Sequence, residues 1–246
     1  MWPYALSFCH SQTRLFLHIL IIITFTGIPC IVGCTDNIEP PPPELTTQQI
    51  IENAIHDSNQ TSILIDSTVV KNDDLRVLDG YSHITSLLFD NSQITDEGLS
   101  HLTNMPGLTQ LRIRSTLSDS AVDSILEMEQ LQYLNLPFAD FTDAGIQALS
   151  QHPEIKLLRI GGPHLTDDAV KHIAKMPSLL FLHLIRVPIT DAALPELYTN
   201  TNLQSLYLDD SLTTEKGLLK LIEHLPQLHL HINQGHLDRD PSKHPH

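Results

Sequence analysis

Arginine, histidine and aromatic residues recur at a nearly constant interval through the middle of the chain. One such series is Arg112, Asn135, Arg159, His183 and Tyr207. Three further side chains stand two residues before or after members of this series, namely Arg114, Tyr133 and Phe181. Because arginine and tyrosine contribute much of the binding energy at protein interfaces, these residues predict a ligand-binding surface. The alternative is a solvated face whose arginines neutralise nearby acids.

No arrangement of residues in this sequence is typical of a catalytic site. The three cysteines are Cys9, Cys30 and Cys34, so the chain beyond its N-terminal segment has no thiol nucleophile. No serine stands in a nucleophile-elbow motif, and Gly161-Gly162 is a lone pair rather than a phosphate-binding loop. His229 and His231 share one face of an expected strand, but two histidines without a third ligand make a poor zinc site. We therefore predict no enzyme activity, no catalytic residue, no metal site and no cofactor.

The regular intervals arise from a repeated unit of about 24 residues, a length typical of stacked repeat proteins. Seven units begin at Gln60, Ile84, Leu108, Leu131, Ile155, Leu179 and Leu203. Apolar residues at the first, fourth and sixth positions of each unit predict a short strand with one buried face. Apolar residues at helical spacing follow, as in Leu99, Leu102 and Met105. Neither element can bury its apolar face alone, so we expect the units to stack into a parallel sheet backed by helices.

This stacking would gather the candidate binding residues on one surface. Side chains alternate along a strand, so the third, fifth and seventh positions of each unit point away from the core. Tyr133 and Phe181 occupy third positions, Arg114 occupies a seventh, and the other candidates occupy fifth positions. Arg112 and Arg159 would lie two strands apart, or about 10 Å.

Most units carry a Thr-Asp or Ser-Asp pair where the helix is expected to begin. The hydroxyl can cap exposed backbone N–H groups, and the carboxylate lies at the positive end of the helix dipole. A calcium ladder is the alternative for these acids, but we favour helix starts because the spacing serves every helix alike. The acids are Asp96, Asp119, Asp143, Asp167, Asp191 and Glu215. A glycine or alanine two residues later, such as Gly98, Gly145 or Gly217, is expected to let the helix lie close to the sheet.

The segment Ile94-Thr95-Asp96-Glu97-Gly98-Leu99 and its copies resemble leucine-rich repeats. They are similar to the class seen in F-box-associated and ribonuclease-inhibitor-like repeats and in bacterial repeat lipoproteins. The resemblance covers residues 60–232, as seven repeats and a closing strand. It implies an α/β solenoid, a horseshoe arc with a parallel sheet on the concave face and helices on the convex face. It also implies a partner bound on the concave sheet. We expect an N-terminal capping helix over residues 45–59 and a disordered tail over residues 233–246.

The N-terminus has the pattern of an export signal. Residues 15–28 are almost entirely apolar, Arg14 precedes them, and Ile31-Val32-Gly33-Cys34 resembles a bacterial lipobox. We therefore predict a lipoprotein signal peptide over residues 1–34, lipidation at Cys34 and a proline-rich linker over residues 35–44. The alternative is an uncleaved membrane anchor from Leu15 to Val32. Either would hold the repeats outside the cytoplasm, tethered to a membrane of the cell envelope.

Charge and repeat together favour a binding function. A formal net charge of −15 disfavours a nucleic-acid partner. We predict a non-enzymatic, membrane-tethered protein that recognises a protein or peptide through its concave sheet. The alternative is an envelope or surface glycan, because arginines and aromatic residues also hold anionic sugars. An enzyme with an unfamiliar site is a third hypothesis, for which the sequence offers no nucleophile.

Overall fold

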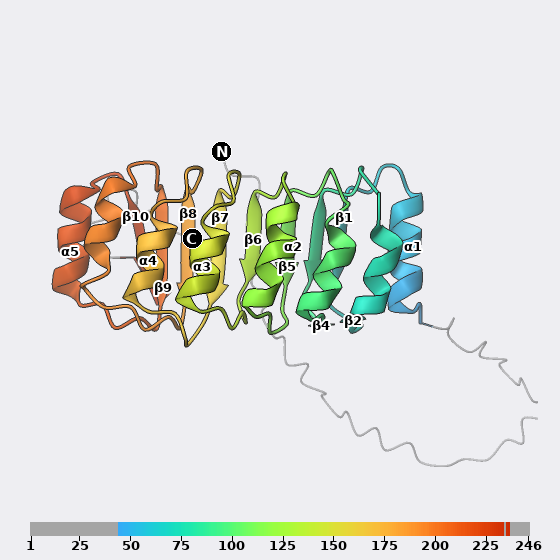
Figure 1. Ribbon diagram of the computed structural model, residues 1–246, viewed down its shortest axis with the longest axis horizontal. Helices are drawn as coiled ribbons and strands as arrows, with labels where there is room; N and C mark the ends of the chain where they lie inside the picture. Colours follow the sequence, from blue (N-terminus) through green and yellow to red (C-terminus); the bar gives the residue numbers. More distant parts are fainter. Residues whose placement is uncertain (1–43, 234, 237–246) are drawn as a thin grey trace, which may run out of the picture. The chain divides into compact units, whose positions relative to one another are not determined.

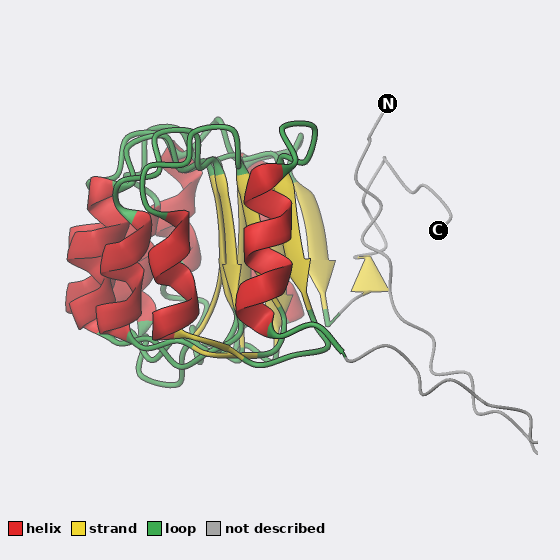
Figure 2. Cartoon of the chain, turned by 90° about the vertical axis from the view of Figure 1, so that its right-hand side faces the viewer, coloured by secondary structure: helices red, strands yellow, loops and turns green. Residues whose placement is uncertain are grey.

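The computed structural model describes residues 44–233 and 235–236, and each repeat in this part contributes one strand and one helical segment (Figure 1). The strands form one layer and the helices a second layer, as the view along the row shows (Figure 2). This arrangement confirms the predicted α/β solenoid, with a parallel sheet on its concave face and helices on its convex face.

The N-terminal predictions fall outside the described residues. They comprise the signal peptide over residues 1–34, lipidation at Cys34 and the linker as far as residue 43. The tail from residue 237 onward also falls outside. Within the part of the chain that the structure describes, no helix is both long and apolar enough to cross a bilayer.

The main sheet keeps the strands in chain order. Its parallel strands are β1 (Ser62–Ile65), β3 (Ser86–Phe89), β5 (Gln110–Ile113), β6 (Tyr133–Leu136), β7 (Leu157–Gly161), β8 (Phe181–Ile185), β9 (Ser205–Asp209) and β10 (His229–Ile232). A short parallel pair, β2 (Val70–Lys71) with β4 (Ser92–Gln93), lies apart from it. Equivalent positions of neighbouring repeats pair with each other, as Leu87 does with Leu111 and Leu111 with Leu134. The fourth and sixth positions therefore form continuous buried rows.

The helical layer consists of short segments, because a unit of this length leaves room for about two turns. The 3-10 segments are η1 (Asn72–Leu78), η2 (Asp96–Leu102), η3 (Asp119–Ala121) and η4 (Leu194–Thr199). The α-helices of the repeats are α2 (Val122–Glu127), α3 (Asp143–Leu149), α4 (Asp167–Ile173) and α5 (Glu215–His224). Leu99, Leu102 and Met105 are buried, as their helical spacing predicted.

Helix α1 (Thr47–His56) lies at the N-terminal end of the row. A capping box starts it: the Thr46 hydroxyl accepts the Gln49 N–H at 3.2 Å, and the Gln49 side chain accepts the Thr46 N–H at 2.9 Å. Ile51, Ala54 and Ile55 are buried, and the helix packs against η1 and β1. In Figure 2 the α1 end faces the viewer, and α1 stands in front of the space between the two layers. The helix lies where a capping segment was expected, and its contribution to stability stays a prediction.

The C-terminal end of the sheet extends past its expected boundary. Strand β10 keeps the register of the repeats, since Leu230 pairs with Leu206. Asn233 then adopts the left-handed region, with φ of 48°, and its side-chain oxygen accepts the Asp210 N–H at 2.8 Å. This turn reverses the chain, and β11 (Gly235–His236) pairs antiparallel with β10. Described structure therefore continues into the segment 233–246 that was expected to be disordered.

The Thr-Asp pairs join neighbouring repeats by hydrogen bonds. Asp143 is representative: its Oδ1 accepts the Thr166 N–H at 2.9 Å, and its Oδ2 accepts the Thr166 hydroxyl at 2.6 Å. The same two bonds link Asp96 to Ser118, Asp119 to Thr142, Asp167 to Thr190 and Asp191 to Thr214. Three of these hydroxyls also cap helix N–H groups as predicted, namely Ser118, Thr166 and Thr214, whereas Thr190 accepts the Ala192 N–H in the turn before η4. We call this series the inter-repeat ladder.

The small residues that follow the acids make room for this ladder. A Cβ atom added at Gly145 would lie 1.9 Å from Asp119 Oδ1, and one added at Gly217 would lie 2.3 Å from Asp191 Oδ1. The predicted need for a small residue was correct, but the predicted reason was wrong. A larger side chain at Gly145 or Gly217 would collide with the carboxylate of the preceding repeat, rather than with the sheet.

Candidate binding surface

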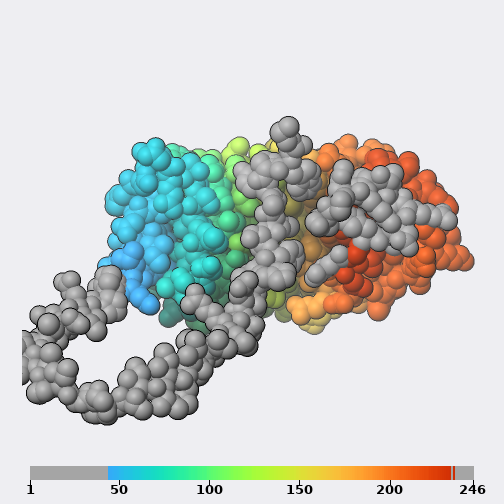
Figure 3. Space-filling view, turned by 180° about the vertical axis from the view of Figure 1, so that it is seen from behind, coloured from blue at the N-terminus to red at the C-terminus, as the bar shows by residue number. Residues whose placement is uncertain are grey.

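Seven of the eight candidate residues lie on strands β5 to β9. Figure 3 views the domain from behind the helical layer of Figure 1, and successive repeats form adjacent bands there. The register sets the fifth-position residues next to one another, in the order Arg112, Asn135, Arg159, His183 and Tyr207. Tyr133 and Phe181 lie on the same face, and Arg114 directly follows β5. The sequence therefore predicted correctly which residues the fold brings together. Ligand binding by them stays a prediction.

Hydrogen bonds connect the central side chains across four strands, β6 to β9. Arg159 donates through Nη1 to Asn135 Oδ1 at 3.2 Å and through Nε to His183 Nδ1 at 3.1 Å. His183 Nε2 lies 2.7 Å from Asp209 Oδ2. Since Nδ1 accepts a hydrogen bond from Arg159 Nε, the proton of the imidazole sits on Nε2, and this N–H donates a hydrogen bond to Asp209. Burial lowers the pKa of His183 and outweighs the raising effect of the Asp209 hydrogen bond, so the ring is neutral at neutral pH.

At the β5 end of the row, Asp90 forms ion pairs with Arg112 and Arg114. Its Oδ2 lies 2.7 Å from Arg112 Nη2, and its Oδ1 lies 3.2 Å from Arg114 Nε. The side chains of Arg112 and Asp90 are 20% and 26% exposed, whereas Arg114 is 42% exposed. One carboxylate is thus shared between two guanidinium groups, and the more exposed of them is available to a ligand.

Arg159 differs from these two arginines because its hydrogen-bond partners, Asn135 and His183, are neutral. Within residues 44–233, no carboxylate lies within ion-pair distance of its guanidinium. Burial lowers the pKa of Arg159 most, and the charges of Arg114 and Arg112 lower it further, whereas those of Asp209 and Asp90 raise it. The group nevertheless stays protonated at neutral pH, because the guanidinium group holds its proton far above neutral pH. The centre of the surface therefore holds a half-buried positive charge.

Aromatic rings continue the row toward β10. Tyr207 stacks on His231 with ring centroids 4.1 Å apart and approaches His183 at 5.3 Å. His231 Nε2 lies 2.9 Å from His229 Nδ1. The register aligns His231 with Tyr207 and His229 with Ser205, so both histidines extend the sheet face. Among the described residues, no group of three or more potential ligands is placed to hold a metal ion.

Third-position and seventh-position side chains border the central row, one set on each side. Third-position residues Tyr133, Leu157 and Phe181 align on β6, β7 and β8. On the seventh-position side, Gly161 aligns with Ile185 in β8. A Cβ atom at Gly161 would lie 2.3 Å from the Pro137 carbonyl oxygen, which explains the glycine. The central row is thus bordered by an apolar patch of Tyr133, Leu157 and Phe181 on one side, and by a mixed row with Pro137 and Ile185 between the charged Arg114 and Asp209 on the other.

Comparison with known proteins agrees with this geometry. Internalin C2 of Listeria monocytogenes superposes with a TM-score of 0.54 and 16% identity, over 80% of this chain and 88% of that chain. The Arabidopsis receptor kinase HAESA, solved with the peptide hormone IDA and the co-receptor SERK1, gives a TM-score of 0.50 and 17% identity. That match covers 74% of this chain and 31% of HAESA. The chain has a leucine-rich-repeat fold. No protein-family profile and no curated protein matches the sequence.

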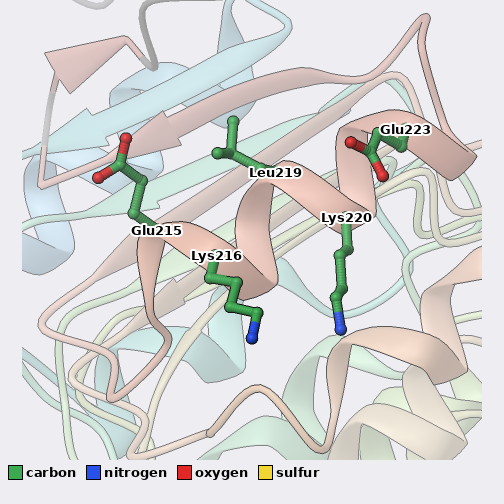
Figure 4. Close-up of a pocket in the computed structure, with 5 residues that line it drawn as sticks. All are labelled: Glu215, Lys216, Leu219, Lys220 and Glu223. Carbon is green, nitrogen blue, oxygen red and sulfur yellow. The ribbon is translucent and has the colours of Figure 1, made fainter.

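The helical side of the leucine-rich-repeat domain carries hollows of another kind. One of about 480 Å³ is lined by α5 residues Glu215, Lys216, Leu219, Lys220 and Glu223. Figure 4 shows the two lysines pointing to one side of the helix, and Glu215 and Leu219 pointing to the other. A smaller hollow of about 200 Å³ lies between α5 and η4. Both are rimmed by exposed charges and resemble ordinary solvated surface.

Sequence reasoning missed how the candidate residues are paired. It did not foresee that Asp90 binds both Arg112 and Arg114, or that Asp209 is taken by His183. It placed His229 and His231 on one face of a strand and rejected them as a metal site, but did not assign them to the candidate binding surface. The repeat register carried the necessary signal, because His231 stands one repeat after Tyr207.

Proposed function

We propose that this protein is a non-enzymatic leucine-rich-repeat binding protein that takes a protein or peptide partner on its sheet face. The observation that carries the proposal is the row from Arg112 to Tyr207, which sets arginine and aromatic side chains side by side next to the apolar third-position residues Leu157 and Phe181. Interfaces have this composition, with aromatic and arginine residues at the centre. HAESA, which has the same fold, was solved with a bound peptide hormone, so the fold can hold a peptide.

We also propose that the domain is tethered to a membrane of the cell envelope through lipidated Cys34. The support is the apolar run of residues 15–28 after Arg14, followed by the lipobox-like Ile31-Val32-Gly33-Cys34. Mass spectrometry of the chain purified from membranes should find Cys34 as the first residue, carrying a lipid. A chain that retains residues 1–33 would instead favour the uncleaved anchor.

The test of partner binding is selection from a random peptide display library on the full-length chain in mild detergent. Selected peptides are then measured against two double variants with equal charge reversal. Arg112→Glu/Arg159→Glu alters the sheet face, and Lys216→Glu/Lys220→Glu alters exposed α5 on the helical side.

Loss of binding in the arginine variant alone supports the proposal. Loss in the lysine variant alone would move the site to the helical side. If no peptide is selected, and an acidic polysaccharide binds the native chain but not the arginine variant, the partner is a glycan.

A further inference from the structure

Among the described residues, Arg159 is the arginine of the sheet face that has no carboxylate within ion-pair distance, and the charges of Asp209 and Asp90 act on it only from farther away. Its two hydrogen bonds go to the Asn135 amide oxygen and to a neutral His183. Burying a charged group is costly unless an opposite charge accompanies it. Proteins retain such groups mainly where they are used, so Arg159 is a strong candidate for direct ligand contact.

The nearby acids are already paired, although Asp90 Oδ1, which forms an ion pair with Arg114, is a buried acceptor without a hydrogen-bond partner among the described residues. Asp90 holds Arg112 and Arg114, and Asp209 accepts the hydrogen bond from His183. Arg112 Nε is, in addition, a buried donor without a hydrogen-bond partner among the described residues. Three guanidinium groups on this face therefore meet two carboxylates, in a chain whose net charge is −15. Among the described residues no further carboxylate pairs with these arginines, so a negatively charged group on the ligand would complete the surface.

The shape of the surface favours an extended peptide over a uniformly charged polymer. Four strand-to-strand steps separate β5 from β9, about 19 Å in all, a length that about six extended residues would span. Successive side chains of an extended peptide point to opposite sides. They would meet Leu157 and Phe181 on one side of the arginine row and Ile185 on the other.

We propose that Arg159 binds a carboxylate side chain of an extended peptide segment that crosses β5 to β9. This inference rests on the proposed peptide-binding function and specifies the ligand. Arg112 and Arg114, held by Asp90, add attraction at one end of the segment. Apolar neighbours of the acidic residue pack on the rows on either side.

The experiment uses two display libraries of heptapeptides that differ only in the central residue, which is aspartate or asparagine. Both are selected on the full-length chain. The tightest aspartate peptide and its asparagine twin are synthesised, and their Kd values are measured with native, Arg159→Gln and Arg159→Lys chains. Arg76→Gln is the matched control, because Arg76 lies on η1 with its side chain 66% exposed. Thermal unfolding confirms that each variant is folded.

The aspartate peptide should bind Arg159→Gln about thirtyfold or more weakly than the native chain, the usual consequence of removing one partner of a buried charge pair. Arg159→Lys should fall between them, and Arg76→Gln should match the native chain. The asparagine twin should bind weakly and be insensitive to Arg159→Gln. A merely structural role for Arg159 would instead weaken both peptides by the same factor.

Three other outcomes overturn the inference. If asparagine peptides bind as tightly as aspartate peptides and still lose binding in Arg112→Glu/Arg159→Glu, the inferred carboxylate contact is wrong, although the proposed peptide-binding function stands. If the selected peptides lose binding only in Lys216→Glu/Lys220→Glu, the proposed surface is wrong as well. If no peptide binds while polygalacturonate binds native chain but not Arg159→Gln, the anion belongs to a glycan.

Discussion

Replacing Asp143 by alanine tests whether the inter-repeat ladder stabilises the solenoid. Asp143 Oδ1 and Oδ2 accept the N–H and hydroxyl of Thr166 at 2.9 and 2.6 Å. Alanine removes both acceptors. At about 0.5–1.5 kcal/mol net for each hydrogen bond, the loss is about 1–3 kcal/mol, and solvent access to the ladder favours the middle of that range, about 2 kcal/mol.

Asp143→Asn is the matched variant, and the protein itself supplies its precedent. Asn72 occupies the equivalent position in the first repeat, where its Oδ1 accepts the Thr95 N–H at 3.0 Å and its Nδ2 donates to the Thr95 hydroxyl at 2.8 Å. An amide can therefore make both contacts, and we expect Asp143→Asn to cost less than about 0.5 kcal/mol. If the acid acted only through the helix dipole, losing its charge would cost as much as alanine does.

Urea unfolding of the three full-length proteins, followed by circular dichroism, measures these differences. The expected order of midpoints is native, then Asp143→Asn close behind, then Asp143→Ala clearly lower. Equal midpoints for the alanine and asparagine variants would refute the hydrogen-bond ladder as the source of stability.

Three further predictions concern pH and the N-terminal helix. His152 is fully buried, and burial lowers its pKa, so the folded state resists protonation of this side chain. The free energy of unfolding should therefore fall as the pH drops below about 6.5, the pKa of an unfolded histidine. In His152→Gln, the urea midpoint of unfolding should change less between about pH 7 and pH 5. The Thr214 hydroxyl and N–H lower the pKa of Asp191, so its stabilisation is present above an unfolded pKa of about 3.9 and is lost below it. Asp191→Asn should flatten the acid limb of the stability curve, and an unchanged acid limb would contradict the assignment. Deleting residues 45–56 uncovers the core behind Ile51, Ala54 and Ile55 and should lower the unfolding midpoint; retained native-like cooperative unfolding would refute the capping role.

The fold could be predicted from the sequence because the same pattern of apolar residues recurs in every unit of about 24 residues. A single strand such as β3 (Ser86–Phe89) is too short to be predicted by itself. The same alternation of buried and exposed positions, repeated at constant spacing, leaves a single way to bury every apolar face. The constant spacing also fixes the register, so the residues that share the sheet face followed directly.

The contacts between side chains could not be predicted in the same way. Arg159 has neighbours on both sides at about 4.8 Å, and a long side chain can turn to either strand. Its pairing with Asn135 and His183 depends on Asp209 holding His183 from the far side. The role of Gly145 was missed for a related reason. The atom that it must avoid belongs to Asp119, which is remote in sequence and near only after the repeats stack.

Hydrogen–deuterium exchange of the full-length chain, with and without the tightest selected peptide, tests most directly whether the sheet face is the binding surface. Protection of β5 to β9, with α3, α4 and α5 unchanged, is the result expected. Protection confined to those helices, with the strands unchanged, would contradict binding on the sheet.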